Sequence, residues 1–451
     1  MIITNSLGSN YSSADLTLAI KLLFQPWKWL KGKETSLLEQ TLLAKFVKFR
    51  PAEAGRNNDV SIRLFLKGRQ AIYEALKILK IGQGDEVIVQ AFTCVAVVQP
   101  ILDLGAIPIY VDVGPKNLNP SLAQIKKSVS PKTKALILQH TLGYLNREND
   151  QIVNWCRNHK IIVIQDLAHA LGAEARWLDD YDGYDDNNLL HHPNTLNTLN
   201  HPICPDAIIL SFSQDKVIDG VSGGALISSL KSHRQSFQSI NQLINWSKIN
   251  ITKSLFYPLL TSTIRQTYNI GLGKIIHFVG KELDLLPSSL DAPDKLTSLP
   301  NALAALILNQ LSKLEKIIVH RRNIALIYDH VIYKRLKLII ALDIKNGSNL
   351  RYPVWVGNRD ELEKKLTKHG FYLMDHWYDA PVSPKWVDNS RVKYRLGSCR
   401  NAENLSLHIL NLPTHINIDQ NKAKILAELI NKYSKRTNYI IKYHKGLAFL
   451  Q

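Results

Sequence analysis

One lysine, Lys216, has the surroundings of a residue that reacts with carbonyl compounds. It follows the apolar run 207–210, which predicts a buried strand, through the stretch Ser211-Phe-Ser-Gln-Asp. Residues just past such strands lie at the edge of an α/β sheet, where open sheets bind ligands. A lysine amine kept partly neutral there can form a Schiff base. Most lysines are solvated surface charges, so the neighbours of Lys216 decide between the two interpretations.

Two features predict a site for a phosphate. Gly68, Arg69 and Gln70 open a predicted helix, whose free backbone N–H groups and dipole favour an anion. Ser211 lies five residues before the lysine and can reach the same group. Gly223-Gly224, which follows the lysine, allows the backbone to turn tightly beneath it.

Two further features predict a site for an aromatic ring. Cys94 follows the strand 86–90, at a place where a ring-shaped ligand can pack. Asp166 follows the strand 161–164, and a buried carboxylate there can keep a pyridinium nitrogen protonated, so that the ring accepts electrons. His169 can hydrogen-bond a ring oxygen. The alternative for Asp166 alone is a helix N-cap. The ordered set of phosphate site, ring site, carboxylate and lysine describes a pyridoxal phosphate (PLP) site.

The elements that would hold these residues alternate along the chain. Strands are predicted at 86–90, 107–111, 135–138, 161–164, 207–210 and 225–228, and helices at 68–77, 97–104, 120–129 and 150–158. Helices of this length between strands indicate a mostly parallel sheet covered on both faces, which is an α/β fold. We expect a helical extension over 1–50, a large cofactor-binding domain over 51–285, a smaller C-terminal α+β domain over 286–436 and a basic tail over 437–451. A linker is expected at 287–300, one long helix at 301–327, and an exposed loop at 177–205.

Composition narrows the class of protein. The chain has 451 residues and a net charge of +18, from 56 basic and 38 acidic residues. Such a charge suits nucleic acid, anionic lipid or an anionic small substrate, but no nucleic-acid-binding motif is present. The four cysteines match no zinc spacing, so we expect no metal and reduced thiols. Without a secretory signal or an apolar run of roughly 18 residues, a cytoplasmic location is expected.

Two segments raise the possibility of contact with a membrane. A helix over 16–30 would place Leu16, Ile20, Leu23 and Trp27 near one face, and three lysines follow. The favoured interpretation is a helix packed on the main body, and the alternative is a helix lying in the membrane plane. The segment 231–281 contains seven basic and no acidic residues among many apolar ones. It predicts helices packed on the body or on a second subunit, or docking on the anionic inner membrane face.

The residues of these motifs and their order resemble those of the DegT/DnrJ/EryC1/StrS family of PLP-dependent sugar aminotransferases, which have the aspartate aminotransferase fold. The resemblance is specific from about Gly68 to Ser228 and weaker from Asn301 to Ile416. The matching stretches are Gly68-Arg-Gln-Ala-Ile72, Gly84 to Thr93, Gly105 to Asp112, Lys132 to His140, Gln165-Asp-Leu-Ala-His-Ala-Leu-Gly-Ala173, Ser211-Phe-Ser-Gln-Asp-Lys216, Gly223-Gly-Ala-Leu-Ile227, Asn401-Ala-Glu-Asn-Leu405 and Leu412-Pro-Thr-His415.

The resemblance implies a role for each residue. Lys216 would form the Schiff base and later move a proton, and Asp166 would pair with the pyridinium nitrogen. His169 would lie near the ring hydroxyl, while Ser211 and the backbone at Arg69 and Gln70 would hold the phosphate. The implied reaction moves an amino group, commonly from glutamate, to a keto group of a nucleotide-linked sugar for polysaccharide or glycoside biosynthesis. The implied assembly is a homodimer with its sites at the interface.

The sequence departs from the family pattern at two positions of the site, and its N-terminal extension, the 177–205 loop and the 231–298 segment are extra or expanded. Cys94 stands at the ring-stacking position, which is usually aromatic. The family's segment that reaches into the partner's site is not recognisable, and Asn301 stands near its expected place. A PLP-dependent sugar dehydratase is the nearest alternative, but such relatives replace the lysine by histidine, and Lys216 argues against it. A non-catalytic regulatory or membrane-docking protein is an alternative of another class, which the intact Asp166 and Lys216 disfavour.

Overall fold

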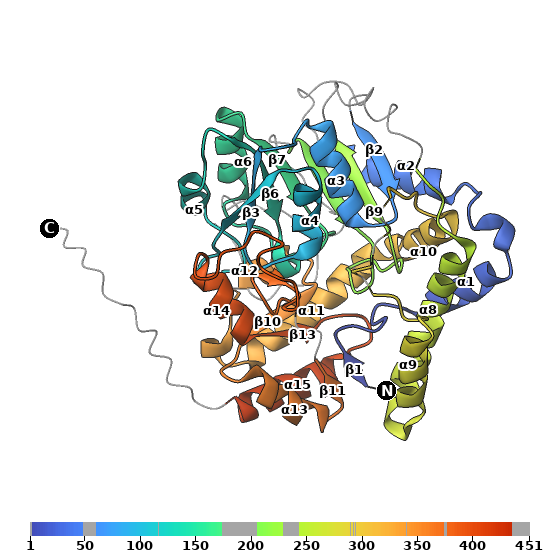
Figure 1. The fold of residues 1–451 in the computed structure, drawn as a ribbon. Coiled ribbons are helices and arrows are strands. Elements are labelled where there is room, and N and C mark those ends of the chain that lie inside the picture. The colour runs from blue at the N-terminus through green and yellow to red at the C-terminus, as the bar shows by residue number, and fades with distance from the viewer. Residues whose placement is uncertain are drawn as a thin grey trace, which may run out of the picture.

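The first layer of the fold is a seven-stranded sheet (Figure 1). The structure is a computed structural model. It describes residues 2–47, 60–115, 117–173, 205–228, 243–288, 290–291, 293, 295–339, 341–373 and 377–434. The strand order is β2-β9-β8-β7-β6-β3-β5, and β9 runs antiparallel to both of its neighbours while the others are parallel. The strands are β2 (Ser61–Phe65), β3 (Glu86–Gln90), β5 (Ile107–Val111), β6 (Thr133–Gln139), β7 (Ile162–Asp166), β8 (Ala207–Ser211) and β9 (Gly224–Ser228).

Side chains of the buried strands point alternately to two apolar layers, as the two-residue period of a strand requires. Val87 and Val89 pack under α3 (Gly68–Ile78) and α4 (Val95–Asp103), whereas Ile88 faces α5 (Leu122–Lys127) and α6 (Asn149–Asn158). Helices thus cover both faces of the sheet. The predicted α/β class is confirmed, and the parallel strands end at one common edge.

A smaller second layer is formed by the C-terminal part of the chain. Its antiparallel pair is β10 (Arg351–Trp355) with β13 (Ile409–Pro413). Helices pack around this pair to form a separate apolar cluster. The helices are α11 (Leu314–Val331), α12 (Ala341–Asn346), α13 (Arg359–Thr367), α14 (Arg400–His408) and α15 (Gln420–Tyr433), and the short strands are β11 (Phe371–Tyr372) and β12 (Val382–Ser383).

The single long helix predicted at 301–327 is wrong, because the structure has two helices there. The first is α10 (Asn301–Leu311), and α11 begins at Leu314. At the break, the Ser312 hydroxyl donates to the Asn309 carbonyl and the Lys313 N–H donates to the Gln310 carbonyl, which tightens the turn. Helix α10 packs among residues of the large sheet's apolar cluster, whereas α11 begins in that cluster and continues into the cluster of the small layer.

The N-terminal segment is built into the interior rather than attached outside. Strand β1 (Ile3–Thr4) pairs in parallel with β11 of the small layer, and residues such as Asn5, Asn10 and Tyr11 are buried. Helices α1 (Ser13–Leu23) and α2 (Glu34–Val47) then pack against α8 (Lys248–Thr267) and α10 respectively. The favoured interpretation, a helix packed on the body, therefore agrees with the structure.

The buried face of α1 differs from the one expected. Its buried residues are Asp15, Ala19 and Leu22, whereas Ile20 and, beyond the helix, Trp27 are exposed. The helix ends at Leu23, before Pro26, so the period cannot continue to Trp27. The long apolar segment that follows the sheet forms α8 (Lys248–Thr267) and α9 (Leu272–Glu282). The greater part of the expected 177–205 loop and all of the 437–451 tail lie outside the described residues.

Candidate active site

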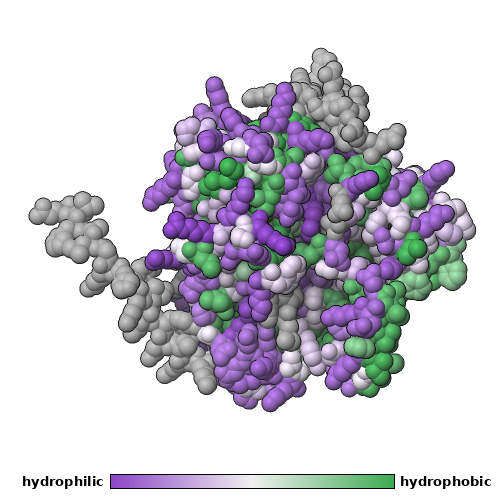
Figure 2. Space-filling view, in the orientation of Figure 1, coloured by the Kyte–Doolittle hydropathy of each residue, from purple (hydrophilic) through white to green (hydrophobic). Residues whose placement is uncertain are grey.

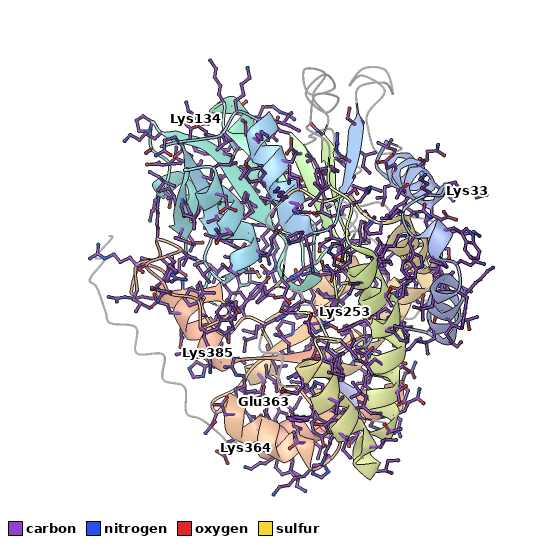
Figure 3. All side chains as sticks on the ribbon, turned by 45° about the vertical axis from the view of Figure 1, so that its right-hand side comes forward. Lys33, Lys134, Lys253, Glu363, Lys364 and Lys385 are labelled. Carbon is purple, nitrogen blue, oxygen red and sulfur yellow. The ribbon has the colours of Figure 1, made fainter. Side chains whose placement is uncertain are left out.

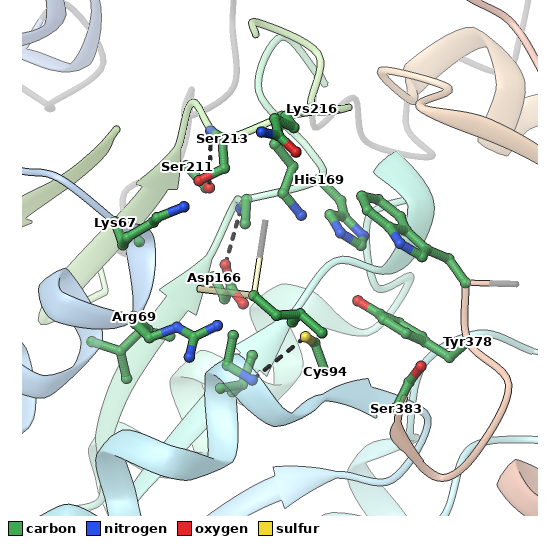
Figure 4. A pocket seen from close by; sticks show the side chains of 18 of the residues that line it. Lys67, Arg69, Cys94, Asp166, His169, Ser211, Ser213, Lys216, Tyr378 and Ser383 are labelled. Carbon is green, nitrogen blue, oxygen red and sulfur yellow. Dashed lines mark hydrogen bonds between the residues drawn. The ribbon is translucent and has the colours of Figure 1, made fainter. Parts of the chain in front are cut away.

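A cavity of about 230 Å³ opens at the edge where the parallel strands end. It lies between the large sheet and a loop of the small layer (Figure 4). Seven of the nine residues expected to form the site line it, namely Gly68, Arg69, Cys94, Asp166, His169, Ser211 and Lys216.

Lys216 lies in the loop that joins β8 to β9, so its place follows from the end of a buried strand. Its side-chain nitrogen is 4.5 Å from the centre of the Trp377 ring. Burial lowers the pKa of Lys216, and the nearby Cys94 and Asp166 oppose that shift only in part. A larger fraction of the amine is therefore neutral than in water, and a neutral amine is the form that attacks a carbonyl.

Asp166 is the last residue of β7 and is buried at the floor of the cavity. Its Oδ1 accepts the backbone N–H of Ala168 at 2.9 Å. This bond precedes a turn over residues 168–172, and no helix begins there, so Asp166 is not the helix N-cap offered as an alternative. This bond uses one oxygen, while the carboxyl group also lines the cavity. Burial raises the pKa of Asp166, and the Ala168 hydrogen bond and Lys216 counteract that rise. A positively charged N–H partner would lower the pKa further, as a pyridinium does.

The hydrogen bonds of His169 determine its protonation. Its Nδ1 lies 3.2 Å from the backbone nitrogen of Leu142, which can only donate. Nδ1 is therefore the acceptor, and in the neutral ring Nε2 carries the proton. Burial, together with the charge of Lys216, holds the pKa of His169 well below its usual value, so the ring is neutral at physiological pH. Its ring stacks on Trp377, with centres 5.1 Å apart.

The other end of the cavity is built to hold an anion. A Cβ atom at Gly68 would lie 3.2 Å from the Ser211 Cβ, so the missing side chain lets the start of α3 approach the end of β8. Lys67, directly before Gly68, is buried and also lines the cavity. Arg69 extends into it, and its buried Nη2 has no hydrogen-bond partner. The buried Lys67 and the half-buried Arg69 place two cations in one cavity, where they repel each other, and a phosphate would relieve that repulsion.

Gln70 and Asn301 do not line this cavity. The Gln70 backbone N–H donates to the Lys67 carbonyl, and its side-chain amide donates to the carbonyl of Lys295. Asn301 is buried, and its amide group bonds the backbone of Lys28 and Glu34 within the same chain. The structure therefore does not support the expected contact of Asn301 with a partner subunit, because that side chain already holds the start of α2.

Aromatic residues from the small layer complete the wall opposite the sheet. Strand β12 pairs in parallel with β4 (Thr93–Cys94), and this pairing brings the loop with Trp377 and Tyr378 over the cavity. Cys94 itself caps α4, since its sulfur accepts the N–H of Ala96. The aromatic groups at this site thus come from a distant stretch of sequence and not from the position of Cys94.

Several residues of the cavity were not anticipated from the sequence. Trp377 and Tyr378 lie in an irregular stretch without period, and only the β12–β4 pairing reveals their place. Lys67 did carry a signal, because a basic residue beside a helix start can face a bound phosphate. The other unanticipated lining residues include Ser213, Gln214, Ser288, Leu290, Asp379 and Ser383.

The N-terminal segment braces the lysine loop from behind. The Asn10 side-chain amide donates to the Lys216 carbonyl at 2.6 Å and accepts from the fully buried Arg321 at 2.6 Å. The Tyr11 hydroxyl donates to Asp219, three residues past the lysine, at 2.7 Å. The first eleven residues therefore connect the reactive loop to α11 of the small layer. Within the described part of the chain, no group of three or more His, Cys, Asp or Glu residues could hold a metal ion.

A parallel sheet with a buried lysine, a buried carboxylate and an anion-binding helix start defines the class of PLP-dependent transferases. The model of the DegT/DnrJ/EryC1/StrS aminotransferase family matches residues 27–231 and 295–431. The chain belongs to this family, which confirms the resemblance, and the unmatched 232–294 contains α8 and α9.

Known relatives and solved structures agree with this assignment. A dTDP-4-dehydro-2,3,6-trideoxy-D-glucose 4-aminotransferase of Saccharopolyspora spinosa is 23% identical over 375 residues, which are 81% of this chain and 82% of the relative. A UDP-N-acetyl-3-dehydro-alpha-D-glucosamine 3-aminotransferase of Acidithiobacillus ferrooxidans is 39% identical, but over only 24% of this chain and 29% of the relative. The solved structure of DesV from S. venezuelae is similar in fold, with a TM-score of 0.65, 18% identity and coverage of 94% of this chain and 95% of DesV.

Proposed function

We propose that this chain is a PLP-dependent aminotransferase that transfers an amino group to a keto group of a nucleotide-linked sugar. The observation that carries the proposal is the cavity in which Lys216, Asp166 and the start of α3 face one another. Those three groups match the aldehyde, the ring nitrogen and the phosphate of one cofactor.

The residues present fit this cofactor. Arg69 has a buried guanidinium nitrogen without a partner, and Gly68 leaves a space that a side chain would fill. Asp166 lies at the floor between this anion site and the lysine (Figure 4). When bound, PLP supplies an electron sink that stabilises negative charge on a substrate carbon.

The chain's own residues supply binding and proton transfer. The Lys216 amine, made less basic by burial, acts as the nucleophile toward an aldehyde and afterwards as the base that carries a proton. Asp166 keeps a bound pyridinium nitrogen protonated. His169 presents a proton on Nε2, so it can donate a hydrogen bond to an acceptor in the cavity. Trp377 and Tyr378 keep water away from the face of the site opposite the sheet.

The substrate, the donor and the assembly belong to the proposal. The relatives act, by their names, on dTDP-, UDP- and GDP-linked sugars, which supports a nucleotide sugar but does not select the nucleotide. Glutamate as amino donor, a homodimer and a role in polysaccharide biosynthesis are further parts of the proposal. The dehydratase alternative is disfavoured by Lys216, and the non-catalytic alternative is disfavoured by a lysine and a carboxylate that both reach the cavity.

The proposal is tested by covalent trapping. Purified protein is incubated with PLP, reduced with borohydride, digested and analysed by mass spectrometry. We expect a pyridoxyl group on Lys216 in the wild type and none in Lys216→Ala. A wild-type protein that stays unlabelled would overturn the proposal. A separate sample of the protein, incubated with PLP but not reduced, is then given glutamate and a panel of keto-sugars linked to dTDP, UDP and GDP, and the amino-sugar product identifies the substrate.

A further inference from the structure

Helix α9 is packed with its apolar side facing solvent. Its buried positions are the small residues Gly273 and Gly280, and a Cβ at Gly273 would lie 2.3 Å from the Ile264 carbonyl oxygen of α8. The large apolar side chains point outward, with Ile275 62% and Phe278 66% exposed. Leu272, Val279 and Leu283 are exposed on the same helix and its end. A surface helix of a globular protein has the opposite arrangement, so this face is shaped for something outside the chain.

A second exposed apolar group lies at the turn after α1. Phe24 is 77% exposed and Trp27 is 67% exposed. Nearby Trp29, by contrast, has a structural role, because it is buried and donates its Nε1–H to the Leu22 carbonyl. We call residues 24–33 the aromatic turn and the exposed side of α9 the apolar face.

The two features belong to one side of the molecule. Helix α1 packs on α8, and α8 packs on α9, so the three form one layer. Figure 1 shows this layer on the right-hand side, and Figure 2 shows apolar residues gathered over α9 at the lower right. Figure 3 turns that side forward, with Lys33 at one margin and Lys253 on α8.

Basic side chains surround both features. No acidic residue occurs between Asp15 and Glu34 in the sequence. Near α9, Glu282 and Asp284 are acidic, but Asp284 is paired with Lys253. The exposed lysines on or beside the two features are Lys21, Lys28, Lys31, Lys33, Lys248, Lys274 and Lys281.

We propose that the apolar face and the aromatic turn dock this enzyme on an anionic lipid surface. Amphipathic helices and aromatic side chains bind at the boundary between headgroups and acyl chains, and nearby lysines are attracted to anionic headgroups. A second copy is a poorer occupant, because a two-fold contact brings the same patch against itself and would set lysines against lysines. No helix in the described ranges is long and apolar enough to cross a membrane, so the contact is peripheral.

The test is vesicle co-sedimentation of the full-length protein. Vesicles contain either phosphatidylcholine alone or phosphatidylcholine with phosphatidylglycerol. We expect binding to the anionic vesicles that weakens at high salt. Two double variants should each lower the partition coefficient into the vesicles by at least about tenfold: Ile275→Ser/Phe278→Ser and Phe24→Ser/Trp27→Ser. Each variant loses two large apolar side chains whose transfer from water into the lipid favours binding. The matched control is Leu407→Ser, which removes an exposed leucine of α14, 64% exposed, outside both features.

Three results would overturn the proposal. The first is a wild-type protein that does not bind anionic vesicles. The second is equal binding by the wild type and both double variants. The third is a fall in molecular mass by light scattering in either double variant, which would assign the surface to a second copy. None of these results bears on the proposed aminotransferase activity, on which the name enzyme rests here, because covalent trapping of PLP at Lys216 does not depend on lipid.

Discussion

The charge of Lys67 offers the sharpest test of the anion end of the site. Burial, together with the charge of Arg69, lowers the pKa of Lys67 from 10.5 to about 8. A lowering of this size corresponds to about 3 kcal/mol of penalty for the charged form. A phosphate that restores the ordinary pKa recovers that free energy. We therefore expect Lys67→Met to weaken PLP binding by up to about 300-fold.

The dependence on pH follows from the sign of the shift. Below pH 8 the lysine is already protonated in the free protein, so the affinity for a phosphate dianion is at its plateau. As the pH rises above about 8, binding must take up a proton, and the affinity falls by up to about tenfold per pH unit. In Lys67→Met, the part of this decrease in affinity that comes from protonation of Lys67 should disappear.

The assay compares two ligands, so that effects on the lysine bond cancel. The dissociation constants of PLP and of pyridoxal, which lacks the phosphate, are measured by absorbance from about pH 6.5, where the phosphate is mostly a dianion, upward. The ratio of the two constants isolates the phosphate contribution. Lys253→Met is the matched control. Lys67 also lines a second cavity beside the first, and Lys253 lines this second cavity but not the one that contains Lys216, and is paired with Asp284. An unchanged ratio in Lys67→Met, with its thermal unfolding unchanged, would refute the reasoning.

Three further predictions concern other parts of the site. Asn10→Ala should remove the hydrogen bond to the Lys216 carbonyl and lower kcat by about tenfold. It should also shift the pH profile of the cofactor absorbance, and Asn10→Gln should partly restore that profile. If kcat and the profile are both unchanged, Asn10 has only a structural role. Asp166→Asn should leave PLP bound but lower kcat by at least about 100-fold, as measured by single-turnover absorbance with glutamate, and near-normal turnover would exclude its role at the ring nitrogen. Gly68→Ala should place a methyl group against Ser211, 3.2 Å from its Cβ, and should weaken binding of PLP more than binding of pyridoxal; equal losses for the two ligands would show a general defect in folding.

The sequence by itself determined the fold class, the family and most of the site's chemistry. The reason is that Asp166, Ser211 and Lys216 each follow a short apolar strand, and parallel strands bring such ends to one edge. Gly68 and Arg69 could be placed because helix starts bind anions through local geometry. Features of this kind are encoded within about ten residues, so no knowledge of distant contacts was needed.

Only the tertiary structure decided which distant groups meet those residues. Trp377 and Tyr378 reach the cavity because β12 pairs with β4, and no local pattern specifies that pairing. Asn10 supports Lys216 across 206 residues of sequence, although the first residues read as an appendage. The sequence pattern predicts that Asn301 lies near a partner subunit, but its side-chain amide forms hydrogen bonds with the backbone of its own chain. The orientation of α9 also depends on packing, since glycines that fit closely against α8 turn its apolar side chains to solvent. Local patterns thus specify strand ends and helix starts, whereas long-range pairing and packing decide which side chains surround them.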